Sequence, residues 1–226
     1  MANQKETKRE RREIAKQRRM EELRRRQRRQ AMRKFWYGGI AVLVIGGIVA
    51  AVMLSSAASK KKTEDLNKLA TSAGCTKLQT FPSEGNSHVA APTRVTYHTN
   101  PPTSGNHRAQ TSFTGVLPNP LPSGLEDENI VHNMEHGQII IWYKPDLDPA
   151  LLDKLTTWVR GNITRRILVV RQNMDYEVAM TAWQHMVGCT NPNAKVVQEA
   201  DAFAETFQGK GPEGTGDAPG TPYTGG

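Results

Sequence analysis

The chain has few cysteines, and most of its length lacks an excess of basic charge. Only two cysteines occur among 226 residues, which excludes a cysteine-rich disulfide scaffold and a four-cysteine zinc site. Residues 1–34 contain 15 basic and 5 acidic side chains, whereas residues 35–226 contain 15 basic and 17 acidic ones. The net charge of +8 therefore arises in the N-terminal segment, and the body of the chain lacks the basic surface typical of a nucleic-acid-binding fold.

Residues 35–59 contain no charged side chain and form one apolar run. Because a helix of about 20 apolar residues spans the hydrocarbon core of a bilayer, we predict a transmembrane helix at 35–58. Fifteen basic residues precede the run and three lysines follow it directly, which places the N-terminus in the cytoplasm and the remainder outside the plasma membrane. A cleavable signal peptide ending at 56–58 is the alternative, but 34 residues are too many for its basic N-terminal part.

Residues 3–34 contain no glycine or proline and are rich in residues that favour helices. We predict a solvated basic helix here, with too few apolar side chains for a packed face. The basic residues within 5–34 are expected to attract anionic lipid headgroups, by about 1 kcal/mol for each one near the membrane surface. Two alternatives are a segment that only fixes the topology and one that contacts nucleic-acid phosphates; we predict no specific nucleic-acid partner.

For the part of the chain after the apolar run, the sequence predicts an α+β domain flanked by two polar segments. Residues 59–73 read as a helical stalk and residues 74–208 as the domain, whereas residues 209–226 contain seven glycines and three prolines and are predicted to be disordered. We expect a small, mostly antiparallel sheet with two packing helices. The predicted strands are residues 94–98, 138–143, 167–171 and 178–183, and the predicted helices are residues 149–160 and 193–207.

Cys75 and Cys189 lie near the two ends of the predicted domain. Outside the cytoplasm such a pair is expected to be oxidised. A disulfide that closes a loop of 114 residues would stabilise the fold by about 4–5 kcal/mol, because it restricts the unfolded chain. The alternative is a pair of thiols that bind a metal or act in redox chemistry, but the wide separation gives no CxxC motif.

All six histidines lie in the predicted domain, five of them between residues 88 and 136. The segment VHNMEHG (131–137) contains H-x-x-E-H, with His132 and His136 four positions apart. On a helix these two imidazoles share one face and can bind one metal, whereas on a strand they would lie about 13 Å apart. A joint site therefore requires a helical turn, which Gly137 would end.

The segment PPTSGNH (101–107) is predicted to hold His107 rigidly, because two prolines and a Ser-Gly turn restrict the backbone. His107, His132 and His136 would form a three-imidazole site with an open fourth position, as in reactive zinc or copper centres. We expect Glu135 to orient one of these imidazoles, or to pair with Arg108.

Two functions from different classes follow from these residues. One is a metal-binding domain outside the cytoplasm, and the other is a structural or interaction protein of the cell envelope whose histidines only hydrogen-bond to loops. A zinc hydrolase would require H-x-x-E-H within a long helix and a distant acidic ligand. Residues 138–141 instead read as a strand directly after the motif, so no catalytic residue is assigned.

Several short motifs occur together in this chain. They are His88-Val89, PPTSGNH (101–107), Gly115-Val116, VHNMEHG (131–137) and AMTAWQHMVGC (179–189). In combination they resemble a family of bacterial membrane-anchored domains of unknown function, and the resemblance covers about residues 74–207. It implies an exported, anchored domain without an assigned activity, it adds His88 to the expected metal ligands, and it does not clearly match His98 or His185. The matching site residues are His88, His107, His132, Glu135 and His136.

Overall fold

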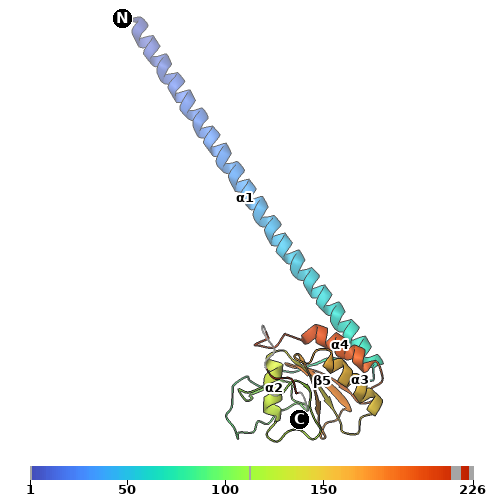
Figure 1. Cartoon of the computed structure of the whole chain (residues 1–226). Helices are drawn as coiled ribbons and strands as arrows, with labels where there is room; N and C mark the ends of the chain where they lie inside the picture. Colours follow the sequence, from blue (N-terminus) through green and yellow to red (C-terminus); the bar gives the residue numbers. More distant parts are fainter. Residues whose placement is uncertain (1, 112, 215–219, 224–226) are drawn as a thin grey trace. The chain divides into compact units, whose positions relative to one another are not determined.

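The computed structural model describes residues 2–111, 113–214 and 220–223 (Figure 1). It divides into two compact units, Met1–Ser59 and Lys60–Gly226. The helix α1 (Ala2–Ser72) accounts for the first unit and ends within the second. The second unit combines helices with a sheet, which confirms the predicted α+β class.

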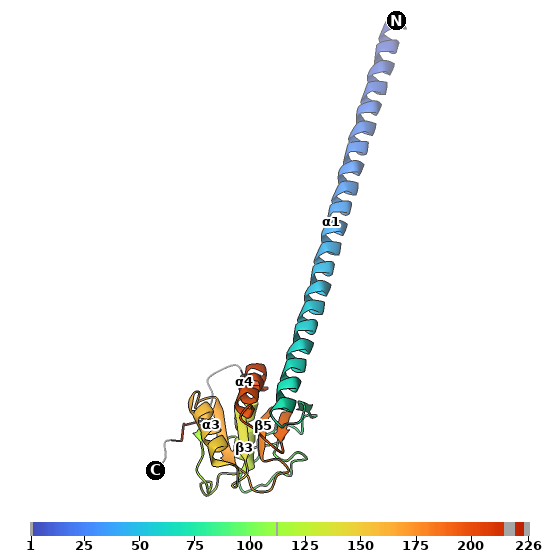
Figure 2. The ribbon, with the colours of Figure 1, turned by 90° about the vertical axis from the view of Figure 1, so that its right-hand side faces the viewer.

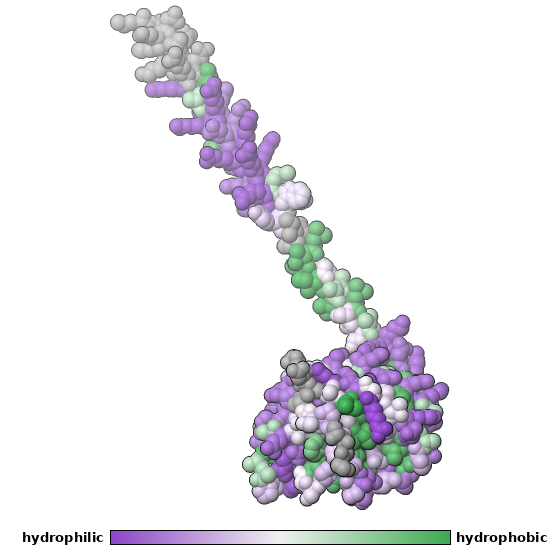
Figure 3. All heavy atoms as spheres, in the orientation of Figure 1, coloured by the Kyte–Doolittle hydropathy of each residue, from purple (hydrophilic) through white to green (hydrophobic). Residues whose placement is uncertain are grey.

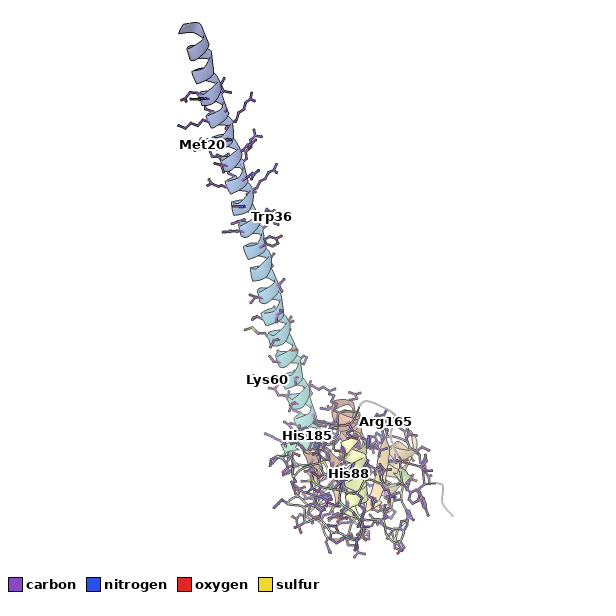
Figure 4. The ribbon with its side chains drawn as sticks, turned by 90° about the vertical axis from the view of Figure 1, so that its left-hand side faces the viewer. Met20, Trp36, Lys60, His88, Arg165 and His185 are labelled. Atoms are coloured by element: carbon purple, nitrogen blue, oxygen red, sulfur yellow. A yellow bond between two sulfur atoms is a disulfide. The ribbon has the colours of Figure 1, made fainter. Side chains whose placement is uncertain are left out.

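Within the first unit, α1 carries polar basic side chains followed by an exposed apolar segment (Figure 3). The stretch Leu43–Ser72 contains a window long and apolar enough to cross a membrane, and no residue of that window is buried. It overlaps the apolar run predicted to span the bilayer. The side chains of Met20 and Trp36 project outward from the helix (Figure 4).

The sheet of the second unit has six strands in the described part of the chain (Figure 2). They lie in the order β1-β6-β5-β3-β4-β2. Both pairs that include β4, namely β3 with β4 and β2 with β4, are parallel, and the other three pairs are antiparallel, as predicted for a mostly antiparallel sheet. The strands are β1 (Gln79–Thr80), β2 (Gly115–Val116), β3 (Ile139–Tyr143), β4 (Arg166–Val170), β5 (Val178–Ala182) and β6 (His185–Cys189).

Three helices of the second unit cover the two faces of this sheet: α2 (Asp127–Glu135), α3 (Pro149–Arg160) and α4 (Val196–Phe207). The helix α3 connects the parallel strands β3 and β4, a connection that needs a crossover. Side chains on β3 alternate between the faces. Ile139 and Ile141 pack in the cluster that includes α3 and α4, whereas Ile140 packs in the cluster that includes α2. Every β3 residue is buried because both faces are covered.

Two sequence predictions are wrong in the described residues. Residues 94–98 form no strand, because backbone donors there are bound by carboxylates: the N–H of Val95 donates to Glu128 and that of His98 donates to Glu84. The tail was predicted to be disordered, but residues 209–214 are hydrogen-bonded to the end of α2. Residues 215–219 and 224–226 lie outside the described residues.

The predicted disulfide is confirmed. Cys75 and Cys189 are bonded to each other, and they also form an isolated bridge between their backbones. Cys75 follows shortly after α1, and Cys189 is the last residue of β6. The bond therefore ties the end of α1 to the sheet.

Candidate metal centre

The C-terminal end of α2 presents two of the predicted imidazoles on one face, His132 from the last turn and His136 from the residue that follows the helix. The ring centroids of His132 and His136 are 4.8 Å apart, and the ring planes lie within 24° of parallel. At the start of the helix, the backbone N–H of Glu126 donates to the side chain of Asn129 at 3.2 Å. Directly after it, Gly137 has a φ of +75°, which glycine adopts without steric cost. The predicted helical turn with a glycine stop is therefore confirmed.

The loop at residues 101–107 buries His107 completely. Its backbone is tied to the turn between β5 and β6, because the N–H of Gln184 donates to the carbonyl of Thr103 at 2.8 Å. The indole ring of Trp183, from the same turn, lies edge-on to His107 with ring centroids 6.0 Å apart. The loop is thus held by contacts to the sheet as well as by its prolines.

The backbone also brings His88 to this place, through an isolated parallel bridge with His107. The N–H of His107 donates to the carbonyl of Ser87 at 3.1 Å, and the N–H of Val89 donates to the carbonyl of His107 at 2.7 Å. This short parallel bridge sets the ring centroid of His88 5.0 Å from that of His107 and 5.1 Å from that of His132. Three imidazoles from three separate segments therefore meet.

These three imidazoles and one carboxylate form a compact donor group, called the inner group below. The ligating atoms of His88, His107, His132 and Glu135 all lie within 4.8 Å of one another. His107, His132 and Glu135 are buried, whereas the side chain of His88 is 47% exposed. The inner group is therefore open to solvent on the side of His88.

Backbone carbonyls bind one ring nitrogen of each buried imidazole. The Nδ1–H of His107 donates to the carbonyl of Gly105 at 2.8 Å, and the Nδ1–H of His132 donates to the carbonyl of Arg108 at 2.5 Å. Since a carbonyl oxygen only accepts, the Nε2 atom of each neutral ring carries a lone pair. Histidines that bind metals commonly have this arrangement, with the other nitrogen bonded to a carbonyl.

The Nε2 atoms face other groups that accept hydrogen bonds. Nε2 of His107 lies 2.9 Å from Oε2 of Glu135, and Nε2 of His88 lies 3.8 Å from the same oxygen. Nε2 of His132 lies 2.9 Å from Nε2 of His136. The lone pair of His107 Nε2 and the oxygen of Glu135 repel at this distance unless a proton or a metal cation lies between them, whereas a neutral His136 can donate from Nε2 to His132. The repulsion is strong in a buried site, because little solvent screens it.

Burial keeps His132 in its neutral form. Loss of solvent contact lowers the pKa of His132 to about 4; the carbonyl of Arg108 opposes this shift, and the imidazoles of His107, His136 and His88 add to it. The ring is therefore uncharged at neutral pH. Its Nε2 lone pair is then available to a metal.

A second donor group, called the outer group below, lies at the C-terminal end of α2. The ligating atoms of Glu135, His136 and Glu213 lie within 4.8 Å of one another, and Glu135 belongs to both groups. Nε2 of His136 is 3.6 Å from Oε2 of Glu213, and these two side chains are 21% and 56% exposed. The outer group is therefore more open to solvent than the inner group.

Every histidine predicted to be a metal ligand lies in one of these two groups. The predicted set of His107, His132 and His136 is nevertheless split between them. His88, which the resemblance added, lies with His107 and His132, whereas His136 joins the outer group. Glu135 contacts His107 directly, and its ion pairs in the described residues are with histidines rather than Arg108. Metal binding by these residues stays a prediction.

Sequence reasoning missed Glu213, which lies 77 residues after His136 in the segment predicted to be disordered. The one sequence feature that could have indicated Glu213 is its place as the acidic residue of a short Gly/Pro segment, GKGPEG (209–214). The other two histidines lie outside both groups. His98 pairs with the carboxylate of Glu84 at 3.1 Å, and His185 stacks on Phe207 with ring centroids 4.2 Å apart.

No curated protein and no solved structure is significantly similar to the chain. One protein family, described as protein of unknown function (DUF3105), matches residues 88–219, which is more than half of the chain. The match includes both donor groups and the segments that position them. The chain therefore belongs to the DUF3105 family.

Proposed function

We propose that this protein is a membrane-anchored metal-binding protein whose folded unit holds Zn²⁺ or Cu²⁺ outside the cytoplasm. The ligands are the Nε2 atoms of His88, His107 and His132 and the carboxylate of Glu135. Residues 35–58 are the anchor, and the basic N-terminal segment stays in the cytoplasm. The protein would carry or buffer its metal at the membrane surface, with His88 as the side of entry.

The arrangement of hydrogen-bond acceptors in the inner group supports this proposal, because ring nitrogens and a carboxylate lie close together. Two buried imidazoles donate through Nδ1 to carbonyls, so their Nε2 lone pairs point toward the remaining donors. A buried carboxylate such as Glu135 is unfavourable unless a positive charge compensates it. A divalent cation among these atoms would remove the repulsion and neutralise the carboxylate together.

The donor types favour a transition metal. Ca²⁺ and Mg²⁺ prefer oxygen ligands, whereas imidazole nitrogen suits zinc and copper. Three imidazoles and one carboxylate fill the four positions of a tetrahedral site. The neutral state of His132 favours binding, because no proton has to leave that ring at neutral pH.

Charge and hydropathy support the anchor and its direction. The basic residues of 5–34 precede the apolar segment of α1, whose side chains are exposed. An apolar helix surface of this length is stable in hydrocarbon, and basic residues on one side favour the cytoplasmic leaflet with its anionic headgroups. The Cys75–Cys189 disulfide supports an oxidising compartment for the folded unit.

We do not extend the proposal to hydrolysis. In the H-x-x-E-H zinc hydrolases the glutamate acts as a general base beside the metal. Here Glu135 is 1% exposed and lies 2.9 Å from His107, within the donor group itself. The competing account is a structural envelope protein in which His107 and Glu135 serve only to hydrogen-bond to each other.

The test is metal binding by the full-length chain in detergent. After removal of metal with a chelator, the protein is titrated with Zn²⁺ or Cu²⁺ and the bound metal is measured by elemental analysis. His107→Ala removes a buried ligand and is expected to weaken the tightest binding by at least about 100-fold, the upper end of the loss seen when a residue that only orients a ligand is removed. His98→Ala is the matched control, because His98 is an exposed histidine outside both groups.

Glu135→Gln checks the result with a smaller change in shape. It keeps the side-chain volume but removes the charge, so it is expected to weaken metal binding while the near-ultraviolet circular dichroism stays that of the folded domain. Absence of bound Zn²⁺ and Cu²⁺ in the folded wild-type protein would overturn the proposal. The proposal would also be overturned if His107→Ala and Glu135→Gln bound metal as tightly as the wild type, because the metal would then lie elsewhere in the protein.

A further inference from the structure

The outer group is built by a strap of the chain, residues 208–214, that lies against the end of α2. The N–H of Gly209 donates to the carbonyl of Gly137 at 2.8 Å, and the N–H of Glu213 donates to the carbonyl of Glu135 at 3.0 Å. A Cβ atom at Gly211 would overlap the carbonyl oxygen of Glu135. Only glycine at position 211 lets the strap lie this close to the end of α2. The close contact fixes the position of Glu213.

In the described residues, the two carboxylates of the outer group face imidazoles. The ion pairs of Glu135 and Glu213 in that part of the chain are with imidazoles only, those of His88, His107 and His136. The side chain of Glu135 is 2% exposed and that of Glu213 is 56% exposed, so the shared carboxylate is shielded from water while Glu213 reaches the surface. A single cation in the inner group binds the shared carboxylate but does not use the ligating atoms of His136 and Glu213.

The shared residue connects the two groups. Glu135 is the one member common to both, and a carboxylate has two oxygens that can each bind a different metal ion. The Nε2 atoms of His132, in the last turn of α2, and His136, directly after that helix, lie 2.9 Å apart. His132 belongs to the inner group and His136 to the outer group, so the two groups are in contact.

We propose that the protein holds two divalent cations, with Glu135 as the bridging carboxylate and His136 and Glu213 as the ligands of the second cation. This inference rests on the proposed function, because the first cation occupies the inner group. The second donor set, one imidazole and two carboxylates, is richer in oxygen than the first. It therefore suits Zn²⁺ and also the harder Mn²⁺, whereas the inner group favours zinc or copper.

Counting bound Zn²⁺ separates the two proposals. The full-length protein in detergent is dialysed to equilibrium against buffered free Zn²⁺, and metal and protein are measured together. Two equivalents are expected for the wild type and one for Glu213→Gln and for His136→Ala. Glu205→Gln is the matched control, because Glu205 is an exposed glutamate on α4 outside both groups, and it is expected to keep two equivalents.

One equivalent in the wild type, retained in Glu213→Gln with unchanged affinity, would overturn the second site and leave the first in place. No bound metal in the wild type would overturn both. The bridge is tested with two equivalents of Mn²⁺ by electron paramagnetic resonance. Spin coupling between the ions is expected in the wild type and not in Glu135→Gln; two uncoupled ions in the wild type would contradict a shared carboxylate.

Discussion

The apolar segment of α1 and the donor groups of the second unit depart from the usual distribution of side chains in opposite directions. Leu43 and Leu54 are large apolar residues that are 76% and 72% exposed. Glu135 and His107 are ionisable residues that are 1% and 0% exposed. Apolar surface is unfavourable in water, and an uncompensated charge is unfavourable in a protein interior.

In our account, a partner outside the chain resolves each departure: hydrocarbon for the α1 segment and metal cations for the donor groups. Some other buried polar groups find a partner within the fold. The indole N–H of Trp142, for example, donates to the hydroxyl of Thr181 at 2.7 Å. The comparison teaches that a long exposed apolar surface, or a buried group of converging ligating atoms, indicates where a solvent other than water or a ligand belongs.

Arginines in the apolar segment would break the first half of the comparison and give the largest effect. Each arginine near the centre of a spanning helix raises the insertion free energy by about 2.5–3.5 kcal/mol. We expect Ile45→Arg combined with Val49→Arg to move most of the protein from the carbonate-resistant membrane fraction to the soluble fraction. Ile14→Arg with Met20→Arg, in the basic segment, should leave fractionation unchanged; full membrane retention of the first variant would contradict the anchor.

Loss of the disulfide would show how much the folded unit depends on an oxidising compartment. Cys75→Ala with Cys189→Ala opens a loop of 114 residues, and the free energy of unfolding should fall by about 4–5 kcal/mol. Alanine avoids placing a hydroxyl at buried Cys189. The measurement is urea unfolding followed by tryptophan fluorescence, with the oxidised wild type as reference. A loss below about 1 kcal/mol would remove the disulfide as support for the location of the domain.

Glu199 sharpens the comparison, because it is a buried carboxyl outside both donor groups. Neither of its oxygens has a hydrogen-bond partner in the described residues, and burial raises its pKa from 4.5 to about 8. The folded protein therefore holds a proton that the unfolded chain has lost between these values, and stability falls as the pH rises from about 5 to 8. The slope contributed by this residue is at most about 1.4 kcal/mol for each pH unit.

Glu199→Gln removes that proton equilibrium while keeping the side-chain volume. Its free energy of unfolding should equal that of the wild type near pH 5 and exceed it at pH 9, measured by urea unfolding across the pH range. Glu205→Gln on the same helix, where the glutamate is exposed, should follow the wild type. Parallel pH profiles for wild type and Glu199→Gln would show that Glu199 is ionised in the folded state.

The elements that the sequence predicted well are specified by neighbouring residues. The helix α3 has the predicted bounds at both ends: Asp148 accepts from the N–H of Leu151, Pro149 occupies the first turn and Gly161 follows the last residue. Such signals are read from a few adjacent positions. Helix α4 begins at Val196, three residues later than predicted, because Asn193 is bound elsewhere: its side chain donates to the carbonyl of Ser72 and its N–H to that of Ala73.

The parts that could not be predicted depend on contacts between distant segments. The residues at 94–98 have the composition of a strand, but carboxylates from two other segments bind their backbone donors. In the donor groups, the pairing of His132 with His136 follows from helical spacing alone. The places of His88 and Glu213 follow from backbone bridges to residues 19 and 78 positions away, and sequence spacing gives no sign of these.

The central claim is that a metal ion lies among Nε2 of His107, Nε2 of His132 and the carboxylate of Glu135. Anomalous X-ray diffraction at the zinc absorption edge, from crystals grown with Zn²⁺, tests it most directly. We predict an anomalous peak about 2.0–2.2 Å from these three atoms. Crystals saturated with Zn²⁺ and then with Cu²⁺ that show no peak there, with Glu135 still hydrogen-bonded to His107, would contradict the claim.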